Sequence, residues 1–365
     1  MDKKLGFGCM RLPMKGSEVD YDEFNKMIDY YMDHGFNYFD TAHGYIGGKS
    51  ETAIRDCLSS RYKREDFILT DKLTEPYFRK KEDIKPFFEE QLKLCGVEYF
   101  DYYLMHAQDR TNYKHFMKCE AYEVAKELKS EGKIKHIGIS FHDTADVLDM
   151  ILSEHPEIEI VQIQFNYIDY EDAGVQSKAV YDVCRKYNKP ILVMEPVKGG
   201  GLVRLPDTAK KVFDDLHQDL SYASYAIRFA ASFDGMFKVL SGMSDLEQLK
   251  DNVSYMEDFK PLNDEEKEAV NKVKKILKDL GGIPCTACRY CVDGCPMKIS
   301  IPDLFSCYNA KKQFNDWNSS MYYDLHTKEN GKASDCIKCG QCERVCPQHL
   351  KIRDYLEEVA NTFEK

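Results

Sequence analysis

Two cysteine runs with the same spacing lie near the end of the chain. The first, CTACRYCVDGCP, covers residues 285–296, and the second, CIKCGQCERVCP, covers residues 336–347. Each run has three cysteines separated by two residues, a fourth cysteine after three more residues, and a proline immediately after it. No segment before residue 285 has this pattern. So many thiols in so short a segment indicate a metal-binding site in a chain that otherwise reads as an ordinary globular protein.

The spacing C-x₂-C-x₂-C-x₃-C-P is typical of proteins that bind two iron–sulfur clusters, in which the fourth cysteine of each run ligates the other cluster. Structural zinc is the alternative, but zinc modules normally carry pairs of cysteines separated by a longer spacer. The spacing therefore predicts two [4Fe–4S] clusters. Their expected ligands are Cys285, Cys288, Cys291 and Cys346 for one cluster, and Cys336, Cys339, Cys342 and Cys295 for the other.

The composition of the whole chain is that of a globular protein. Of its 365 residues, 43% are hydrophobic and 31% are charged, and the length suits one large domain and one small domain. The formal net charge of −11 argues against nucleic acid or an anionic membrane surface as a partner. Residues 284–365 contain eleven basic and eleven acidic residues, so the negative charge lies in the first part of the chain.

The cellular location can be predicted from the apolar segments and the cysteines. No apolar run has the length of a membrane span, and the N-terminal sequence MDKKLGFGCMRLP lacks the apolar region of a signal peptide. We therefore expect a cytoplasmic protein, in which thiols stay reduced and 14 cysteines favour metal over disulfides. We interpret the cysteines outside the two runs as core residues: Cys9, Cys57, Cys95, Cys119, Cys184 and Cys307.

Eight short apolar segments recur through the first part of the chain, and each is followed by helix-like sequence. They cover residues 4–10, 36–42, 66–72, 100–106, 134–140, 158–166, 190–196 and 237–243. Apolar strands that alternate with helices indicate a parallel sheet covered by helices. Eight such units predict an α/β fold of the (β/α)₈ barrel type. A doubly wound open sheet is the rival, but no G-x-G-x-x-G fingerprint follows the first strand.

We divide the chain into three parts. Residues 1–262 form the barrel, residues 263–283 form a charged helical connector, and residues 284–365 form a small, mostly helical domain that carries the cysteine runs. The segment between the two runs reads as helical. The run VKGGGL, residues 197–202, follows the seventh strand, and its glycines could let backbone amides approach a phosphate or could simply make a flexible loop.

Polar residues close several of the apolar strands. Asp40 ends the second strand and Tyr45 follows it, Lys72 ends the third strand, and His106 ends the fourth. In a (β/α)₈ barrel the chemistry takes place at the carboxyl ends of the strands, so barrel closure would bring these four side chains around one mouth.

In these features the sequence resembles the aldo-keto reductases. The segments LGFGCMRLP, FDTAHGYIGGKSE, ILTDK, YYLMHA and SDLEQLKDN are similar to motifs of that family and occur in its order, over residues 1 to about 260. The resemblance implies an oxidoreductase in which Tyr45, Lys72, Asp40 and His106 reduce a carbonyl or related unsaturated group of a small molecule with hydride from NAD(P)H.

The four residue types suit that chemistry. A carbonyl oxygen gains negative charge as hydride arrives, so a proton must be donated to it. A free tyrosine has a pKa near 10. We expect the neighbouring Lys72 to lower that pKa by stabilising the phenolate, Asp40 to hold the lysine, and His106 to orient the carbonyl.

The resemblance also implies nicotinamide contacts at Ser140, Gln162 and Asn166. Where the family commonly has an aromatic residue after the seventh strand, this chain has Met194, which stacks less rigidly. The remaining expected contacts are Gly242, Gln248 and Asn252, in a segment whose only basic residue is Lys250. Because a phosphate is held well only by a basic fork, these departures weigh against NADP preference.

The two halves of the sequence combine different redox chemistries. Iron–sulfur clusters carry electrons singly, whereas a nicotinamide delivers a pair as hydride, and a flavin is the cofactor that can join them. We expect the clusters to exchange electrons with the barrel and with an external carrier such as ferredoxin. The alternatives are a ferredoxin-driven reductase without nicotinamide, a nucleotide-binding redox sensor or electron-transfer subunit, and clusters that only stabilise the domain.

Overall fold

A computed structural model describes residues 3–285, 287, 289–346 and 348–364. Cys288, one of the predicted cluster ligands, lies outside the described residues. The chain divides into two compact units. The first contains residues 1–170, 177–196 and 223–262, and the second contains residues 171–176, 197–222 and 263–365.

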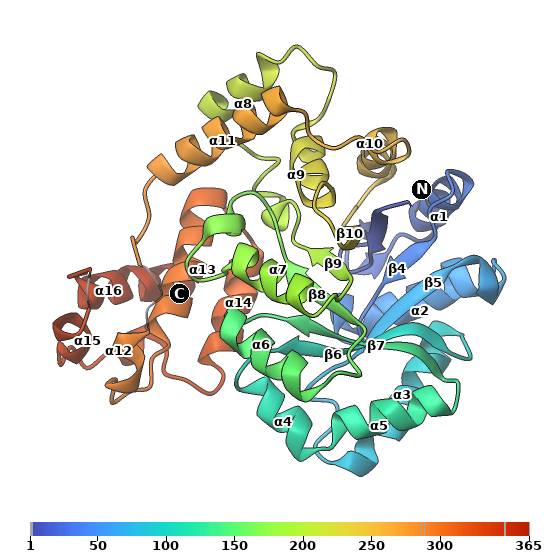
Figure 1. Ribbon diagram of the computed structural model, residues 1–365, viewed down its shortest axis with the longest axis horizontal. Coiled ribbons are helices and arrows are strands. Elements are labelled where there is room, and N and C mark those ends of the chain that lie inside the picture. Colours follow the sequence, from blue (N-terminus) through green and yellow to red (C-terminus); the bar gives the residue numbers. More distant parts are fainter. Residues whose placement is uncertain (1–2, 286, 288, 347, 365) are drawn as a thin grey trace. The chain divides into compact units, whose positions relative to one another are not determined.

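The first unit is built on a closed barrel of eight parallel strands, which confirms the predicted fold class (Figure 1). The order around the barrel is β1-β10-β9-β8-β7-β6-β5-β4, and β1 closes it by pairing with both β10 and β4. The strands are β1 (Leu5–Gly8), β4 (Tyr38–Asp40), β5 (Ile68–Leu73), β6 (Phe100–Gln108), β7 (Ile134–Phe141), β8 (Ile160–Gln164), β9 (Ile191–Met194) and β10 (Met236–Ser241). A small hairpin, β2 (Met14–Lys15) with β3 (Glu18–Val19), was not predicted.

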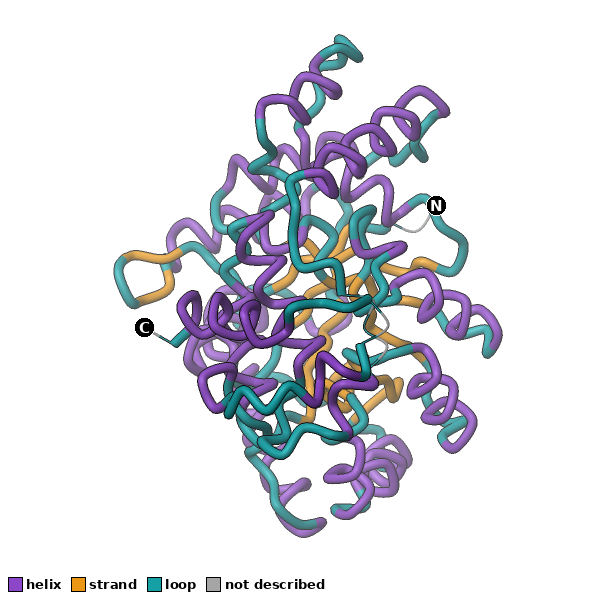
Figure 2. Tube along the Cα trace, turned by 90° about the vertical axis from the view of Figure 1, so that its left-hand side faces the viewer, coloured by secondary structure: helices purple, strands orange, loops and turns teal. Residues whose placement is uncertain are grey.

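Helices cover the outside of this barrel, and Figure 2 shows the strands gathered among them. They are α1 (Tyr21–Asp33), α2 (Lys49–Ile54), α3 (Lys81–Cys95), α4 (Asn112–Lys118), α5 (Ala121–Ser130), α6 (Ala145–Glu154), α7 (Ser177–Lys186), α9 (Tyr222–Ala231) and α10 (Leu246–Met256). The first of them illustrates the local rules. Asp20 caps α1 by accepting a hydrogen bond from the Glu23 backbone N–H, and the helix buries Phe24, Ile28 and Tyr31 on one stripe.

The barrel interior is filled with side chains. Tyr38, Leu104, Ile160, Leu192 and Leu240 form one buried cluster. At Gly138 of β7 an added Cβ would lie 2.5 Å from the Leu104 side chain and 2.8 Å from the Ile160 carbonyl oxygen, so the interior has room only for glycine there. Because the barrel is a packed core and not a pore, binding and chemistry belong at the strand ends.

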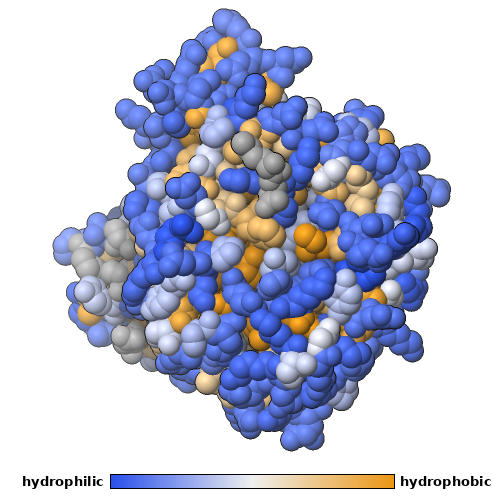
Figure 3. Space-filling model, turned by 45° about the vertical axis from the view of Figure 1, so that its right-hand side comes forward, coloured by the Kyte–Doolittle hydropathy of each residue, from blue (hydrophilic) through white to orange (hydrophobic). Residues whose placement is uncertain are grey.

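The surface fits a molecule with its apolar residues inside. Figure 3 shows hydrophilic side chains over most of one face, with smaller hydrophobic areas between them. Within the part of the chain that the structure describes, no helix is long and apolar enough to cross a membrane.

The second unit is mostly helical. Its helices are α8 (Asp207–Asp214), α11 (Asp264–Asp279), α12 (Tyr290–Asp293), α13 (Ile301–Phe314), α14 (Asn318–Thr327), α15 (Gln341–Arg344) and α16 (Ile352–Phe363). Asn263 and Glu266 form a reciprocal capping box that begins α11, which packs against α8. Lys274 of α11 also forms a 3.0 Å ion pair with Glu171, so a short segment that follows β8 along the chain belongs to this unit.

The glycine run after β9 also folds within the second unit. Gly199 has a φ of +61°, and an added Cβ would lie 2.0 Å from Oδ1 of the buried Asp316, in the turn between α13 and α14. A Cβ at Gly201 would lie 2.6 Å from Cβ of Phe314. Gly199 and Gly201 therefore allow this loop to pack closely against the end of α13. At these two positions the space that a side chain would need is filled by protein atoms.

We expect Gly199→Ala to lower the free energy of unfolding of the second unit by about 2–4 kcal/mol, because it combines a steric clash with a left-handed backbone. Gly281→Ala is the matched control in the same unit, since Gly281 has a φ of +82° but no atom within 4 Å of its Cβ position. That variant should lose only about 1–2 kcal/mol. Anaerobic denaturation followed by circular dichroism measures both, and equal losses would show that the packing against Asp316 is unimportant.

Candidate active site and cysteine pockets

Lys72 is the centre of a buried polar cluster at the carboxyl ends of the strands. Its side chain is fully buried, and Nζ donates hydrogen bonds to Oδ1 of Asp40 at 2.7 Å and to the Thr41 carbonyl oxygen at 2.7 Å. Gln162 of β8 donates to the other carboxylate oxygen of Asp40 at 3.2 Å. Burial lowers the pKa of Lys72, but the nearby Asp40 and Tyr45 outweigh it and raise this pKa above its ordinary value. Lys72 therefore keeps its charge at neutral pH.

Tyr45 lies against this lysine. It begins a short 3₁₀ turn, Tyr45–Gly48, in which Ile46, Gly47 and Gly48 all have positive φ, so the chain reverses tightly after β4. The Lys72 ammonium is 4.9 Å from the centre of the Tyr45 ring. Burial raises the pKa of Tyr45, and the charge of Lys72 opposes this only in part. The expected lowering of the tyrosine pKa is therefore absent, because loss of water costs the phenolate more than one ammonium returns.

His106 completes the group from the end of β6. Its ring centre is 6.1 Å from that of Tyr45, and its Nδ1 lies 2.8 Å from the Thr74 hydroxyl. Burial and the charge of Lys72 hold the pKa of His106 well below its usual range, so the imidazole is neutral. The strand is irregular here, with Ala107 at a φ of +51° and its N–H donated to Ser140 Oγ at 2.7 Å.

The structure thus brings Asp40, Tyr45, Lys72 and His106 together from the ends of three neighbouring strands. A phenol that stays protonated, a permanent ammonium beside it and a neutral imidazole form a set that can donate a proton to an oxygen as negative charge develops there.

Two of the expected nicotinamide contacts belong to the same site. Ser140 and Gln162 are register partners on β7 and β8. The Ser140 oxygen accepts from Ala107, so its own hydrogen remains available to a ligand. Asn166 is different, because its amide donates to Asp169 Oδ2 and the Glu195 carbonyl while its oxygen accepts two backbone N–H groups. All its hydrogen-bonding capacity is used locally.

The other expected nicotinamide contacts pack against, or form hydrogen bonds with, neighbouring protein residues. Met194 ends β9 and is half-buried. Gln248 donates to Asp245 Oδ2 at 2.6 Å and accepts from the Ser244 N–H, so it helps to cap α10. Asn252 is buried and donates to Ser241 Oγ at 2.7 Å. At Gly242 an added Cβ would lie 3.4–3.6 Å from the side-chain carbons of Arg11.

Sequence reasoning missed several residues of this site. Arg11 lies beside Gly242 although it belongs to the segment after β1, and only barrel closure brings the two together. Thr74 and Gln91 contact His106 and the Lys72 backbone. Arg11 could have been predicted as a site residue because it lies in the family-like motif LGFGCMRLP. Thr74 and Gln91 belong to no recognisable motif.

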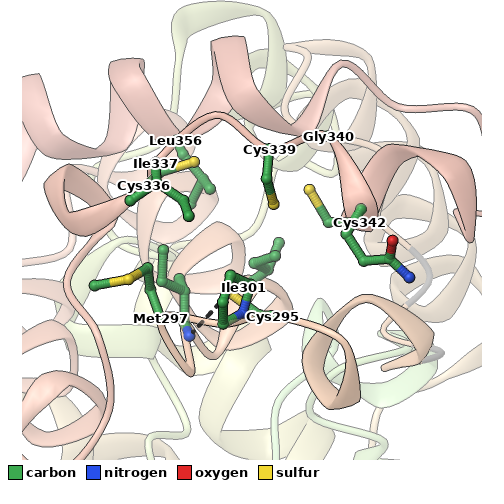
Figure 4. A pocket seen from close by; sticks show the side chains of 12 residues that line it. Cys295, Met297, Ile301, Cys336, Ile337, Cys339, Gly340, Cys342 and Leu356 are labelled. Carbon is green, nitrogen blue, oxygen red and sulfur yellow. Dashed lines mark hydrogen bonds between the residues drawn. The ribbon is translucent and has the colours of Figure 1, made fainter.

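Four cysteines from the two runs line one pocket of the second unit (Figure 4). Cys336, Cys339 and Cys342 come from the second run and Cys295 from the end of the first. The pocket has about 320 Å³ of empty volume, and Ile299, Ile301 and Leu356 form part of its apolar wall. The Ile299 backbone N–H donates to Cys295 Sγ at 3.4 Å, the bond drawn as a dashed line in Figure 4.

A second pocket has the complementary set. Cys285 and Cys291 of the first run line it together with Cys346, the last cysteine of the second run. Its empty volume is about 330 Å³, and the Ala287 backbone N–H donates to Cys285 Sγ at 3.4 Å. Thiols converging on an apolar cavity, with backbone N–H groups directed at sulfur, are the surroundings that an iron–sulfur cluster requires. The described residues of both pockets therefore fit such clusters.

The two parts of the chain match two family models. Residues 4–275 match the aldo/keto reductase family, and residues 284–350 match the 4Fe-4S dicluster domain. An uncharacterized oxidoreductase of Bacillus subtilis (strain 168), YqkF, is 25% identical in an alignment over 281 residues, and the alignment covers 68% of this chain and 86% of that protein. The NADH-specific methylglyoxal reductase of Escherichia coli (strain K12) is 24% identical in an alignment over 263 residues, and this alignment covers 60% of this chain and 78% of that protein.

Solved structures agree on the barrel. The holo form of the aldo-keto reductase AKR11C1 from Bacillus halodurans superimposes with a TM-score of 0.60 at 25% identity, covering 74% of this chain and 91% of that one. An aldo-keto reductase from Klebsiella pneumoniae in complex with NADPH gives a TM-score of 0.60 at 18% identity, covering 74% and 90%.

The barrel and these relatives define an oxidoreductase enzyme. The chain belongs to the aldo/keto reductase family, and a 4Fe-4S dicluster domain follows its barrel.

Proposed function

We propose that this protein reduces the carbonyl group, or a related unsaturated group, of a small molecule, with Tyr45 as the proton donor. The observation that carries this proposal is the contact of the half-buried Tyr45 with the fully buried Lys72, whose ammonium is held by Asp40 at 2.7 Å. A binding protein that catalyses nothing has no need of a buried ammonium beside a phenol.

The residues of the site divide the work. His106 donates a hydrogen bond to the carbonyl oxygen and orients it. Tyr45 gives its proton to that oxygen as negative charge develops, and this proton forms the new O–H bond. The phenolate left on Tyr45 is stabilised by Lys72, and Asp40 keeps Lys72 in place. The carboxylate also balances the buried charge, so the site stays neutral before the proton moves.

The reducing equivalents come from cofactors. When bound, NAD(P)H would supply a hydride, the two clusters would supply single electrons, and a flavin would exchange between the two. Ser140 and Gln162 would hold the nicotinamide amide. The names of two relatives support nicotinamide, because the E. coli protein is called NADH-specific and the Klebsiella protein was solved with NADPH.

Arg11 is our candidate for binding the phosphate that distinguishes NADPH from NADH. It is a basic residue whose side chain lies against Gly242, in a region where the family's phosphate contacts would otherwise be missing. We expect Arg11→Ala to weaken NADPH binding about tenfold and NADH binding much less, since a charge-assisted hydrogen bond is lost. Lys250→Ala is the control, because Lys250 is exposed and paired with Glu247 at 2.9 Å. Fluorescence titration measures both, and equal weakening by the two variants would refute the role of Arg11.

The eight run cysteines would hold the clusters, four in each pocket, with Cys288 assigned from its spacing alone. We propose that an external one-electron carrier such as ferredoxin docks beside the pocket in Figure 4. Cys339 is exposed, and the neighbouring Ile337 side chain is 61% exposed. A guanidinium nitrogen of Arg344 lies 3.7 Å from the Gly340 Cβ position, and the nearby Arg353 is paired with Glu343 at 2.8 Å. Arg344 would therefore supply the positive charge of this rim that an acidic carrier meets.

The experiment that tests the proposal is anaerobic purification followed by analysis of iron, sulfide and extracted cofactors, and then titration with NADH and NADPH. Binding of either nucleotide, with turnover of one member of a carbonyl panel, supports it. Turnover with a reduced carrier but no binding of either nucleotide would instead favour a ferredoxin-driven reductase, which the engaged amide of Asn166 and the methionine at position 194 also favour. Tight nucleotide binding with no turnover would indicate a sensor.

A further inference from the structure

The Thr74 hydroxyl lies between two groups that can each accept its single hydrogen. One is Nδ1 of His106 at 2.8 Å, and the other is the Lys72 carbonyl oxygen at 3.2 Å. The choice matters because a neutral imidazole carries one N–H. If Thr74 donates to Nδ1, the ring proton must be on Nε2. If Thr74 donates to Lys72, it can accept from Nδ1–H, and Nε2 is then left without a proton.

The Lys72 carbonyl already has a donor. Nε2 of the buried Gln91 lies 3.0 Å from that oxygen and 3.3 Å from Oε1 of Glu51. On its other side, Oε1 of Gln91 faces the Tyr103 hydroxyl at 2.5 Å. Both contacts require the same orientation of the Gln91 amide. Its nitrogen donates to the Lys72 carbonyl oxygen, which can only accept, and its oxygen accepts the hydrogen of the Tyr103 hydroxyl. The Lys72 carbonyl can accept two hydrogen bonds, but Gln91 already satisfies it, so the shorter bond to Nδ1 of His106 is the better use of the Thr74 hydrogen.

The backbone that carries His106 is held as firmly. The His106 carbonyl oxygen accepts from Asn112 Nδ2 at 3.0 Å and from Gln108 Nε2 at 3.1 Å. Thr74 lies two residues after Lys72, immediately after the end of β5, and β5 pairs with β6, the strand that carries His106. The catalytic lysine and the histidine are therefore coupled through one threonine.

We infer that Thr74 is a positioning residue that keeps the proton of His106 on Nε2, and that Gln91 favours this arrangement by already donating to the Lys72 carbonyl. Only that tautomer can donate a hydrogen bond to a substrate oxygen. The inference rests on the proposed function of the site, since it specifies how His106 becomes a donor.

The test is ¹⁵N NMR of the histidine ring nitrogens in the full-length, anaerobically purified protein without substrate, with His106→Asn used only to assign the signals. In the wild-type protein His106 should give the Nε2–H pattern. Thr74→Val, which keeps the shape and removes the hydroxyl, should move the tautomer ratio toward Nδ1–H by about two- to tenfold. Thr74→Ser keeps the hydroxyl and should restore the wild-type pattern.

Gln91→Leu gives an independent test, because the hydrogen bonds of Gln91 go to the Lys72 carbonyl, Glu51 and Tyr103 and not to His106 or Thr74. It removes one donor from the Lys72 carbonyl, so Thr74 should donate to that oxygen more often and the His106 signals should shift in the same direction as in Thr74→Val. In turnover of a carbonyl compound, Thr74→Val should lower kcat about three- to tenfold with a smaller change in KM.

Unchanged His106 signals in Thr74→Val, or an Nδ1–H pattern in the wild-type protein, would overturn the inference. Its failure can be distinguished from failure of the proposed function, because the NMR readout needs no substrate. If the tautomer shifts as expected but no carbonyl is ever reduced, the positioning holds and the proposed reaction is wrong.

Discussion

Tyr45→Phe should lower carbonyl reduction by about 10²- to 10⁴-fold while leaving the iron content of the protein unchanged. The substitution removes one oxygen atom, the atom that donates the proton, and leaves the ring beside Lys72. The turnover of whichever panel carbonyl the wild-type protein reduces fastest, measured with iron determined on the same sample, checks the result. Tyr62→Phe is the control, because Tyr62 also loses a hydrogen bond, to Asp29 at 2.6 Å on the outside of the barrel. Undiminished turnover in Tyr45→Phe would mean that the group of Asp40, Tyr45, Lys72 and His106 has no part in the mechanism.

The pKa directions give this prediction a pH signature. Burial raises the pKa of Tyr45 above its ordinary value, so the donor stays protonated at neutral and mildly alkaline pH. The pKa of Lys72 is raised as well, and that of His106 is held well below its usual range. None of these three should titrate between about pH 6.5 and about pH 9, so none of them should change the rate of reduction over this range. The hydrogen bond to Glu51 raises the pKa of His43 above its ordinary value, so His43 is the group near Tyr45 that can titrate there. A fall in rate between pH 7 and about 6.5 that persists in His43→Gln would mean that His106 titrates near its ordinary pKa.

The fourth cysteine of each run is assigned to the cluster that the other run binds, and cysteine substitutions test this assignment. Cys295 belongs to the first run but lines the pocket of Cys336, Cys339 and Cys342. Cys295→Ser should therefore lose the same cluster as Cys342→Ser, and Cys291→Ser should lose the other one. Each variant should retain about four iron atoms per chain where the wild-type protein holds about eight.

Electron paramagnetic resonance of the reduced variants distinguishes the two clusters. The spectra of Cys295→Ser and Cys342→Ser should be alike, and that of Cys291→Ser should differ. Cys307→Ser is the control, since Cys307 is a buried cysteine of α13 in the same core but outside both runs. It should keep both clusters. If Cys295→Ser instead resembled Cys291→Ser, each run would bind its own cluster and the crossed assignment would be wrong.

The sequence predicted the barrel because its strands are apolar runs with a helix after each, and all eight are found. The candidate catalytic residues could be predicted from the same apolar runs. Asp40, Lys72 and His106 are polar residues at the ends of apolar strands, a pattern that burial alone does not explain. The cysteine pockets also follow from spacing, because a fixed number of residues between ligands constrains where their sulfur atoms can converge.

Other features depend on contacts between distant segments and left no local pattern. Gly199 looks like a loop glycine, and only the position of Asp316 shows what it packs against. Thr74 and Gln91 are ordinary polar residues until the fold places them around the Lys72 carbonyl. The pKa of Tyr45 was expected to fall because Lys72 is near. It rises because the depth of burial, which the sequence does not reveal, outweighs that charge.

The proposed function requires the barrel site and the cysteine domain to work together as one redox enzyme. The direct measurement is to reduce the anaerobic protein with reduced ferredoxin, remove the excess donor, add a panel of small carbonyl compounds that includes methylglyoxal, and follow the visible iron–sulfur absorbance. We expect one of these compounds to restore the absorbance of the oxidised clusters in the wild-type protein, and we expect Tyr45→Phe to abolish this reoxidation. Reoxidation at the same rate in Tyr45→Phe, or no reoxidation by any carbonyl compound that the protein reduces with NAD(P)H, would contradict this expectation.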